Sequence, residues 1–201
     1  MKHFNIEIKE NSCLTKNNYL EGILLDNDEK NECLACFDKH MDYFSKLLEI
    51  EFNNELEKTL KRFKNFEEIK DLNKCQFSGI YIMVLDKYKQ MYVGVSNNIK
   101  KRIEQHWSKV VNKDYLPNSI NDSPMGIDCF KALDTTRIYV KNCEEKIKST
   151  NQILNQLIPD YKKQNYYFLE NEEAKIIKFI NPKFLCNKYI RTTMHQIKRE
   201  L

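Results

Sequence analysis

Glu173 carries a charge at a position where the sequence predicts burial. On a helical wheel it lies in the middle of the apolar face of a helix predicted over residues 166–180. The other residues of that face are Leu169, Ile176, Ile177 and Ile180. An ionised carboxylate removed from water is costly unless it is paired or bound to a metal ion. Glu173 is therefore a candidate metal ligand, or else a half-exposed Glu or one bonded to a buried Tyr or Arg.

Two tyrosines are predicted to share one face of a β-hairpin. Apolar and β-branched residues fill 79–85 and 91–95 on either side of a short polar break, a pattern typical of a hairpin. If Asp86 to Lys89 form a four-residue loop, Tyr81 lies opposite Gly94 and diagonal to Tyr92. Both phenols could then reach one small ligand, whereas a slip by one residue would separate them. Either tyrosine alone could also be an ordinary strand aromatic.

A helix is predicted directly after the hairpin, with Ser96 or Asn97 as its N-cap. Its apolar stripe consists of Ile99, Ile103, Trp107 and Val110. Arg102 and His106 lie one turn apart on the flank of this stripe, so we expect them to point along the sheet. His106 could instead cap a neighbouring carbonyl group.

The first part of the chain is predicted to be a mainly helical subdomain over residues 1–70. Apolar residues recur at spacings of three and four through 29–70, which predicts one or two helices, and residues 1–28 give only weak strand signals. Cys33 and Cys36 are better explained as small buried side chains one turn apart than as a metal or redox pair.

Residues 71–201 form the second predicted part. They contain a long polar loop over 112–126, a strand over 137–142 and a helix that ends at Pro159. Loops of that length in compact domains are usually functional or disordered. We assign residues 112–165 largely to an insertion and the C-terminal residues to a basic tail.

Composition and charge narrow the class of function. The 201 residues are 41% hydrophobic and 31% charged, as expected of a globular protein. No apolar run approaches the roughly 20 residues of a membrane span, and the seven cysteines have no secretory context, so we expect a cytoplasmic location.

The charge is distributed unevenly along the chain. Residues 1–70 contain 11 Lys and Arg and 15 Asp and Glu, a net charge of −4, whereas the remainder contains 22 Lys and Arg and 14 Asp and Glu, a net charge of +8. A positive excess confined to one part indicates a polyanion site.

The ordered set of motifs resembles the GIY-YIG nuclease superfamily. That superfamily has a Gly-Ile-Tyr at the start of one strand and a Tyr-Ile/Val-Gly at the end of the next. An Arg follows on the first helix, and a Glu on a later helix precedes hydrophobic residues, a Pro and an Asn. The matching residues here are Gly79-Ile80-Tyr81, Tyr92-Val93-Gly94, Arg102, His106 and Glu173 in "EAKIIKFINPKF".

The resemblance covers roughly residues 77–187 and departs from the family pattern in two places. The closing Asn usually comes about three residues after the Pro, but here Asn187 comes two residues late. The segment between Arg102 and Glu173 is also longer than in the minimal family module. A small insertion or bulge would reconcile the position of Asn187; otherwise its polar contact is absent.

The fold that the resemblance implies is α+β, with a small central antiparallel sheet of three strands flanked by helices. The implied activity is that of a metal-dependent endonuclease that hydrolyses phosphodiester bonds in double-stranded DNA. Glu173 would bind Mg²⁺ (or Mn²⁺) that keeps most of its waters and contacts the phosphate. Arg102 would offer a planar set of donors to the non-bridging oxygens.

The remaining catalytic roles are also implied by the resemblance. Tyr81 would accept the proton of the attacking water, helped by nearby positive charge because a phenol has a reference pKa of about 10. Tyr92 would position the water or the phosphate, and His106 would contact the phosphate or share in proton transfer. We expect Gly79 and Gly94 to let the DNA backbone approach the sheet. Further expected DNA contacts are Lys101, Lys183, Asn187, Lys188 and Arg191.

Two other readings of the sequence remain open. The late Asn187 favours a DNA-binding or scaffold protein in which a nuclease fold no longer cuts. Alternatively, residues 1–70 could be a protein-interaction module, and their apolar stripe could mediate a homodimer. Among nucleases, the Arg102 and His106 pair resembles the restriction and homing branches.

Overall fold

The chain is described by a computed structural model for residues 1–10, 12–109, 125–155, 164–187, 189–190 and 195–196. Its main helices are α1 (Asn27–Lys46), α2 (Glu49–Arg62), α3 (Ile99–Ser108), α4 (Glu144–Asn155) and α5 (Gln164–Phe179). Its strands are β1 (Lys2–His3), β2 (Ile6–Glu7), β3 (Glu67–Ile69), β4 (Gly79–Leu85), β5 (Gln90–Ser96), β6 (Arg137–Asn142), β7 (Tyr189–Ile190) and β8 (His195–Gln196). Short 3₁₀ turns are η1 (Leu72–Lys74), η2 (Asp86–Tyr88), η4 (Ile127–Cys129), η5 (Ala132–Asp134) and η7 (Pro182–Phe184).

The fold is α+β, as predicted, and its central sheet is antiparallel with the strand order β3-β6-β4-β5. The sheet therefore has four strands rather than the three expected. The additional strand, β3, has only three residues, two of them Glu, so it carries no alternation that sequence reasoning could detect. β3 lies within residues 1–70, which thus contribute an edge strand to the central sheet.

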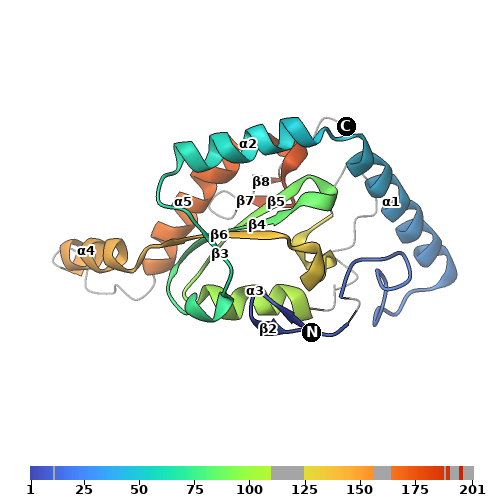
Figure 1. Cartoon of the computed structure of the whole chain (residues 1–201), viewed down its shortest axis with the longest axis horizontal. Helices are drawn as coiled ribbons and strands as arrows, with labels where there is room; N and C mark the ends of the chain where they lie inside the picture. The colour runs from blue at the N-terminus through green and yellow to red at the C-terminus, as the bar shows by residue number, and fades with distance from the viewer. Residues whose placement is uncertain (11, 110–124, 156–163, 188, 191–194, 197–201) are drawn as a thin grey trace.

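Helices cover both faces of this sheet (Figure 1), so its central strand, β4, is buried along its whole length. Alternate residues of β4 enter two separate apolar clusters, because successive side chains of a strand point to opposite faces. Ile80 and Ile82 pack with residues of α2 and α5, whereas Tyr81 and Met83 pack with residues of α1 and α3. The second of these clusters contains Tyr81 and Tyr92, the two tyrosines of the candidate site.

The apolar stripe of residues 29–70 packs against other parts of the same chain. It forms two helices, α1 and α2, and α1 begins with a capping box between Asp26 and Glu29. Phe44 of α1 is 2% exposed in the cluster with Tyr81, and Phe52 of α2 is 1% exposed in the other cluster. Because these side chains already have partners in the core, the described residues give no support to a homodimer formed through the stripe.

The β4–β5 hairpin has the predicted register. Leu85 pairs with Gln90, Tyr81 pairs with Gly94 and Met83 pairs with Tyr92, so residues 86–89 form the connection. The turn η2 closes the connection, and Lys89 adopts the left-handed conformation with φ 49°. The two phenols consequently project from the same face of the sheet.

The other predicted elements are present with small differences. The N-cap of α3 is Asn98 rather than Ser96 or Asn97, because its side chain accepts a hydrogen bond from the Lys101 amide at 2.9 Å. Strand β6 has the predicted bounds. Residues 112–124 of the predicted loop and Pro159 lie outside the described residues. None of the described helices is long and apolar enough to cross a membrane.

Candidate active site

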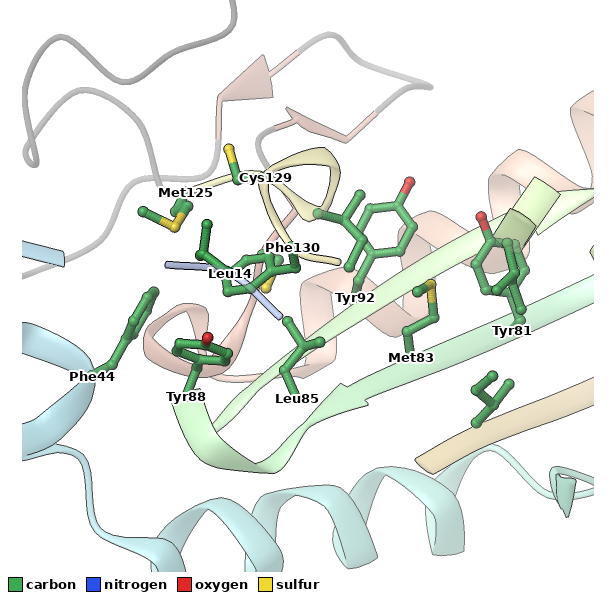
Figure 2. Packing of buried hydrophobic residues seen from close by; sticks show 14 of the residues in the cluster. Leu14, Phe44, Tyr81, Met83, Leu85, Tyr88, Tyr92, Met125, Cys129 and Phe130 are labelled. Carbon is green, nitrogen blue, oxygen red and sulfur yellow. The ribbon is translucent and has the colours of Figure 1, made fainter. Parts of the chain in front are cut away.

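Tyr81 is the central side chain of the candidate site. It is fully buried, and its hydroxyl lies 3.0 Å from Nε2 of His106 on α3. The ring of Tyr92 lies 6.1 Å from the ring of Tyr81 and 5.1 Å from that of His106, centroid to centroid. Figure 2 shows the two tyrosines on the neighbouring strands β4 and β5, on the same side of the sheet as Met83. Two strands and one helix therefore bring two phenols and an imidazole together.

The two glycines of the hairpin make room for atoms of the protein itself. A Cβ at Gly94 would lie 2.5 Å from the Tyr81 hydroxyl oxygen and 2.9 Å from Cε1 of Tyr92. A Cβ at Gly79 would lie 2.1 Å from the carbonyl oxygen of Lys141 on β6. Real Cβ atoms do not approach other atoms so closely. Internal packing is thus an immediate reason for glycine at both positions, and the approach of DNA to these glycines stays a prediction.

Arg102 and Glu173 both act electrostatically on Tyr81. Burial raises the pKa of Tyr81 well above its ordinary value, and the neighbouring Tyr92 and Glu173 raise this pKa further. Arg102 opposes them through its positive charge and a hydrogen bond to the phenol. Glu173 is only 3% exposed, as its position on the apolar face of α5 predicted. Tyr92, Arg102 and Glu173 therefore all lie near enough to Tyr81 to shift its pKa, and Arg102 is the half-buried one of the three.

His106 is held by a residue that sequence reasoning missed. Its Nδ1 lies 2.6 Å from Oδ1 of Asp128 in η4, and Oδ2 of Asp128 lies 2.5 Å from the ammonium of Lys109. Burial lowers the pKa of His106 and outweighs the hydrogen bond to Asp128, which raises it. Burial alone would raise the pKa of Asp128, but hydrogen bonds from His106 and Lys109 hold it at about 2. His106 is accordingly neutral and Asp128 ionised near neutral pH.

Asn187 holds β5 from the side of the following chain segment. Its Oδ1 accepts a hydrogen bond from the Val93 amide at 3.0 Å, and its Nδ2 donates one to the Val93 carbonyl at 2.8 Å. The side chain is 4% exposed. Val93 lies between Tyr92 and Gly94, so this pair of bonds fixes the strand that carries the second phenol. The late position of Asn187 in the sequence therefore does not leave it without a polar contact.

The basic residues expected to contact DNA lie in different environments. Lys101 is exposed and lines an open pocket together with Arg102, Asn98 and Gln105. The ammonium of Lys183 instead lies 2.5 Å from a carboxylate oxygen of Glu51. Lys188 and Arg191 lie outside the described residues.

The donor set at this site fits a magnesium-like ion with few protein ligands. Glu173 is the carboxylate whose charge acts on Tyr81. Among the described residues, no group of three or more His, Cys, Asp or Glu is placed to hold a metal, as a zinc site would require. Mg²⁺ is commonly bound by one or two carboxylates together with water and substrate phosphate. Glu173 could hold such an ion in that manner.

Comparison with known proteins supports the resemblance seen in the sequence. The family model described as the GIY-YIG catalytic domain matches residues 77–166. Tyr81, Tyr92, Arg102 and His106 lie within this match, whereas Glu173 lies beyond its end. The search of curated proteins gave no match, and neither did the search of solved structures. The chain therefore contains a GIY-YIG catalytic domain, which begins at residue 77.

Proposed function

We propose that the protein is a metal-dependent endonuclease that hydrolyses phosphodiester bonds in double-stranded DNA. A GIY-YIG catalytic domain indicates a nuclease-type function in general. The observation that carries the finer proposal is that an imidazole, a guanidinium and a carboxylate all interact with the buried phenol of Tyr81. Together these groups can take a proton from water, bind a phosphate and hold a divalent cation.

Tyr81 accepts the proton of the attacking water in this proposal. Its raised pKa keeps the phenol protonated at neutral pH, so Tyr81 can take a proton only if it also gives one away. The Nε2 atom of His106, 3.0 Å from the hydroxyl, is the acceptor within reach. His106 therefore shares in the proton transfer.

Arg102 binds the phosphate that is being cleaved. Its guanidinium already donates to the Tyr81 phenol, and its side chain also lines the open pocket beside Lys101. A guanidinium at the border between a buried phenol and an open pocket can bind a non-bridging oxygen while it lowers the pKa of Tyr81. Tyr92 positions the water or the phosphate, and Lys101 contacts the DNA backbone.

Glu173 would hold Mg²⁺ or Mn²⁺. Such an ion, when bound, supplies positive charge to the phosphate oxygens and the leaving oxygen. The burial of Glu173 favours this role because a carboxylate away from bulk water gains from a strongly bound counter-charge.

Cleavage of supercoiled plasmid DNA in the presence of Mg²⁺ tests the proposal. Wild-type protein should nick or linearise the plasmid, chelation with EDTA should stop the reaction, and added Mg²⁺ or Mn²⁺ should restore it. Glu173→Gln should lower the cleavage rate by about 10²- to 10³-fold, because it removes one stabilising charge from the site.

Glu172→Gln is the matched control. Glu172 is the preceding residue of the same helix, and its carboxylate pairs with Lys175 at the surface. This variant should cleave at the wild-type rate. A wild-type protein that binds the plasmid in gel-shift assays and never cuts it, with either metal, would overturn the proposal in favour of a non-cleaving DNA-binding protein.

A further inference from the structure

We propose that Asp128 is a positioning residue of the site: it fixes the tautomer of His106, so that Nε2 is left free of a proton and accepts the Tyr81 hydroxyl. The inference rests on the proposed nuclease function and adds a residue that the catalytic motifs do not contain. Asp128 touches neither Tyr81 nor a substrate directly and would act through His106.

Three elements that are distant in the sequence align the three side chains. Tyr81 comes from β4, His106 from α3 and Asp128 from η4. The hydroxyl of Tyr81 is 3.0 Å from Nε2 of His106, and Nδ1 of the same ring is 2.6 Å from Oδ1 of Asp128. The imidazole is 3% exposed. Each ring nitrogen therefore has one partner inside the protein.

The chemistry of Asp128 decides which nitrogen carries the proton. An ionised carboxylate can only accept hydrogen bonds, so Nδ1 must donate to Oδ1. In a neutral imidazole the other nitrogen is then an acceptor, and the partner of Nε2, the Tyr81 hydroxyl, must be the donor. The ring is thus set to receive a proton from Tyr81 before any substrate binds.

Lys109 holds the second oxygen of Asp128. Its ammonium lies 2.5 Å from Oδ2, and Lys109 follows α3 directly as its C-cap residue. Because an ammonium can only donate, it demands an acceptor at this position. Both oxygens of Asp128 are therefore committed to donors, one to Nδ1 of His106 and one to Lys109.

The proton step balances within the chain. As water attacks, its O–H bond breaks and its proton goes to the oxygen of Tyr81. The O–H bond of Tyr81 breaks and that proton goes to Nε2 of His106, with no change in oxidation state. The resulting imidazolium is stabilised by the negative charge of Asp128. One proton has then moved from water to His106 through Tyr81.

Among the described residues, the charged and titratable groups that face His106 come from three neighbouring elements and from its own helix. They are Tyr81 of β4, Tyr92 of β5, Asp128 of η4, and Arg102 and Lys109 of its own helix and helix end. Asp128 is the only one of these five that is negatively charged at neutral pH. Replacement of Asp128 should therefore have the largest effect on the tautomer of His106.

The variant Asp128→Asn makes a sharp test because of Lys109. The Lys109 ammonium favours the amide oxygen of the new side chain on its own side, so we expect the NH₂ group to turn towards Nδ1 of His106. Nδ1 must then accept, the proton moves to Nε2, and Nε2 can no longer accept from Tyr81. We expect a loss of about 10²- to 10⁴-fold in kcat, with KM for plasmid DNA little changed.

A second substitution should rescue the first. In the double variant Asp128→Asn with Lys109→Met, no ammonium claims the amide oxygen, so this oxygen can face Nδ1 and restore the original tautomer. Lys109→Met alone is the control for any loss of a charge near the DNA. We expect the double variant to recover most of the kcat that Asp128→Asn loses.

The tautomer itself can be read without any activity. In ¹⁵N-histidine-labelled protein, NMR distinguishes the protonated from the bare ring nitrogen, and His106→Asn assigns the signals of His106. The proton should be on Nδ1 in the wild type, on Nε2 in Asp128→Asn, and on Nδ1 again in the double variant.

The possible outcomes separate the inference from the proposed function. If the wild type cleaves DNA and Asp128→Asn cleaves equally fast, or keeps the wild-type tautomer, the inference is wrong and the nuclease function stands. A loss of kcat in Asp128→Asn that matches a loss of folded protein by circular dichroism, without rescue by Lys109→Met, also overturns it. An inactive wild type would defeat the proposed function, while the NMR signals would still decide whether Asp128 sets the ring.

Discussion

The hydroxyl end of Tyr81 occupies the space where a side chain at Gly94 would be. A Cβ at that glycine would lie 2.5 Å from both Cζ and the hydroxyl oxygen of Tyr81, its partner across the β4–β5 hairpin. The glycine of the second motif thus makes room for the tyrosine of the first. The two halves of the family signature are linked by packing as well as by chemistry.

Gly94→Ala should displace both phenols and stop cleavage. The methyl group would clash with Tyr81 and Tyr92, and a misplacement of about 1 Å at a reacting group can cost on the order of 10²-fold in rate. Gly79→Ala is the matched control, since its Cβ would strike the Lys141 carbonyl on β6 and not a phenol. Both variants should lose about 1–3 kcal/mol of unfolding free energy in urea titrations. Only Gly94→Ala should lose activity beyond its loss of folded protein; equal cleavage rates would contradict this explanation.

Tyr81→Phe should abolish most cleavage while the protein stays folded. The variant keeps the ring in the core and removes the hydroxyl that, in the proposed mechanism, exchanges protons with water and His106, a contribution of about 10²- to 10⁴-fold in rate. Tyr88→Phe is the control, because the Tyr88 hydroxyl, also buried in this cluster, donates to Asp134 at 2.9 Å. Tyr88→Phe should lower stability by about 1–3 kcal/mol and leave cleavage of the folded protein intact. Single-turnover rates and urea unfolding of both variants test this contrast: Tyr81→Phe should lose activity, and Tyr88→Phe should lose stability.

Lower pH should reduce both activity and stability through His106. Burial lowers its pKa below 6.5, so protonation at acid pH removes the acceptor for the Tyr81 proton, and kcat should fall only below pH 6.5. The unfolded chain binds this proton more readily than the folded chain does. The contribution of neutral His106 to stability is therefore complete above pH 6.5 and is lost as the pH falls below that value. The ionised carboxylate of Asp128 contributes fully to stability above pH 3.8, and this contribution is lost as the pH falls towards its folded pKa of about 2. Urea unfolding between pH 3 and 8 should show the upper transition in wild type and not in His106→Asn.

Asn187→Ala should loosen β5. The substitution leaves the amide and carbonyl of buried Val93 without their partners, and a buried polar group left unsatisfied costs about 1–3 kcal/mol. Asn187→Asp keeps the acceptor for the Val93 amide and loses the donor, so it should lose stability as well. Hydrogen exchange of the Val93 amide should accelerate in the Ala variant. Unchanged exchange would show that β4, its one neighbour in the sheet, holds β5 without Asn187.

Periodicity was enough to predict several parts of the site. The alternation of apolar residues and the four-residue break define the hairpin, and from that hairpin follows the pairing of Tyr81 with Gly94. Helical spacing places Arg102 and His106 one turn apart, and it places Glu173 on the buried face of α5. Each of these statements concerns the face of one element, which local sequence encodes directly.

The tertiary structure decided the contacts between elements. Asp128 is 22 residues from His106, on the short turn η4, and nothing in its local sequence indicates a partner. Asn187 reaches Val93 over 94 residues, and β3 gains its place from pairing with β6. Periodicity specifies which side of an element is buried, whereas the partner across the interface depends on the path of the chain in space. For this protein, the sequence alone therefore indicated the residues of the candidate site, and only the folded chain showed what holds them in position.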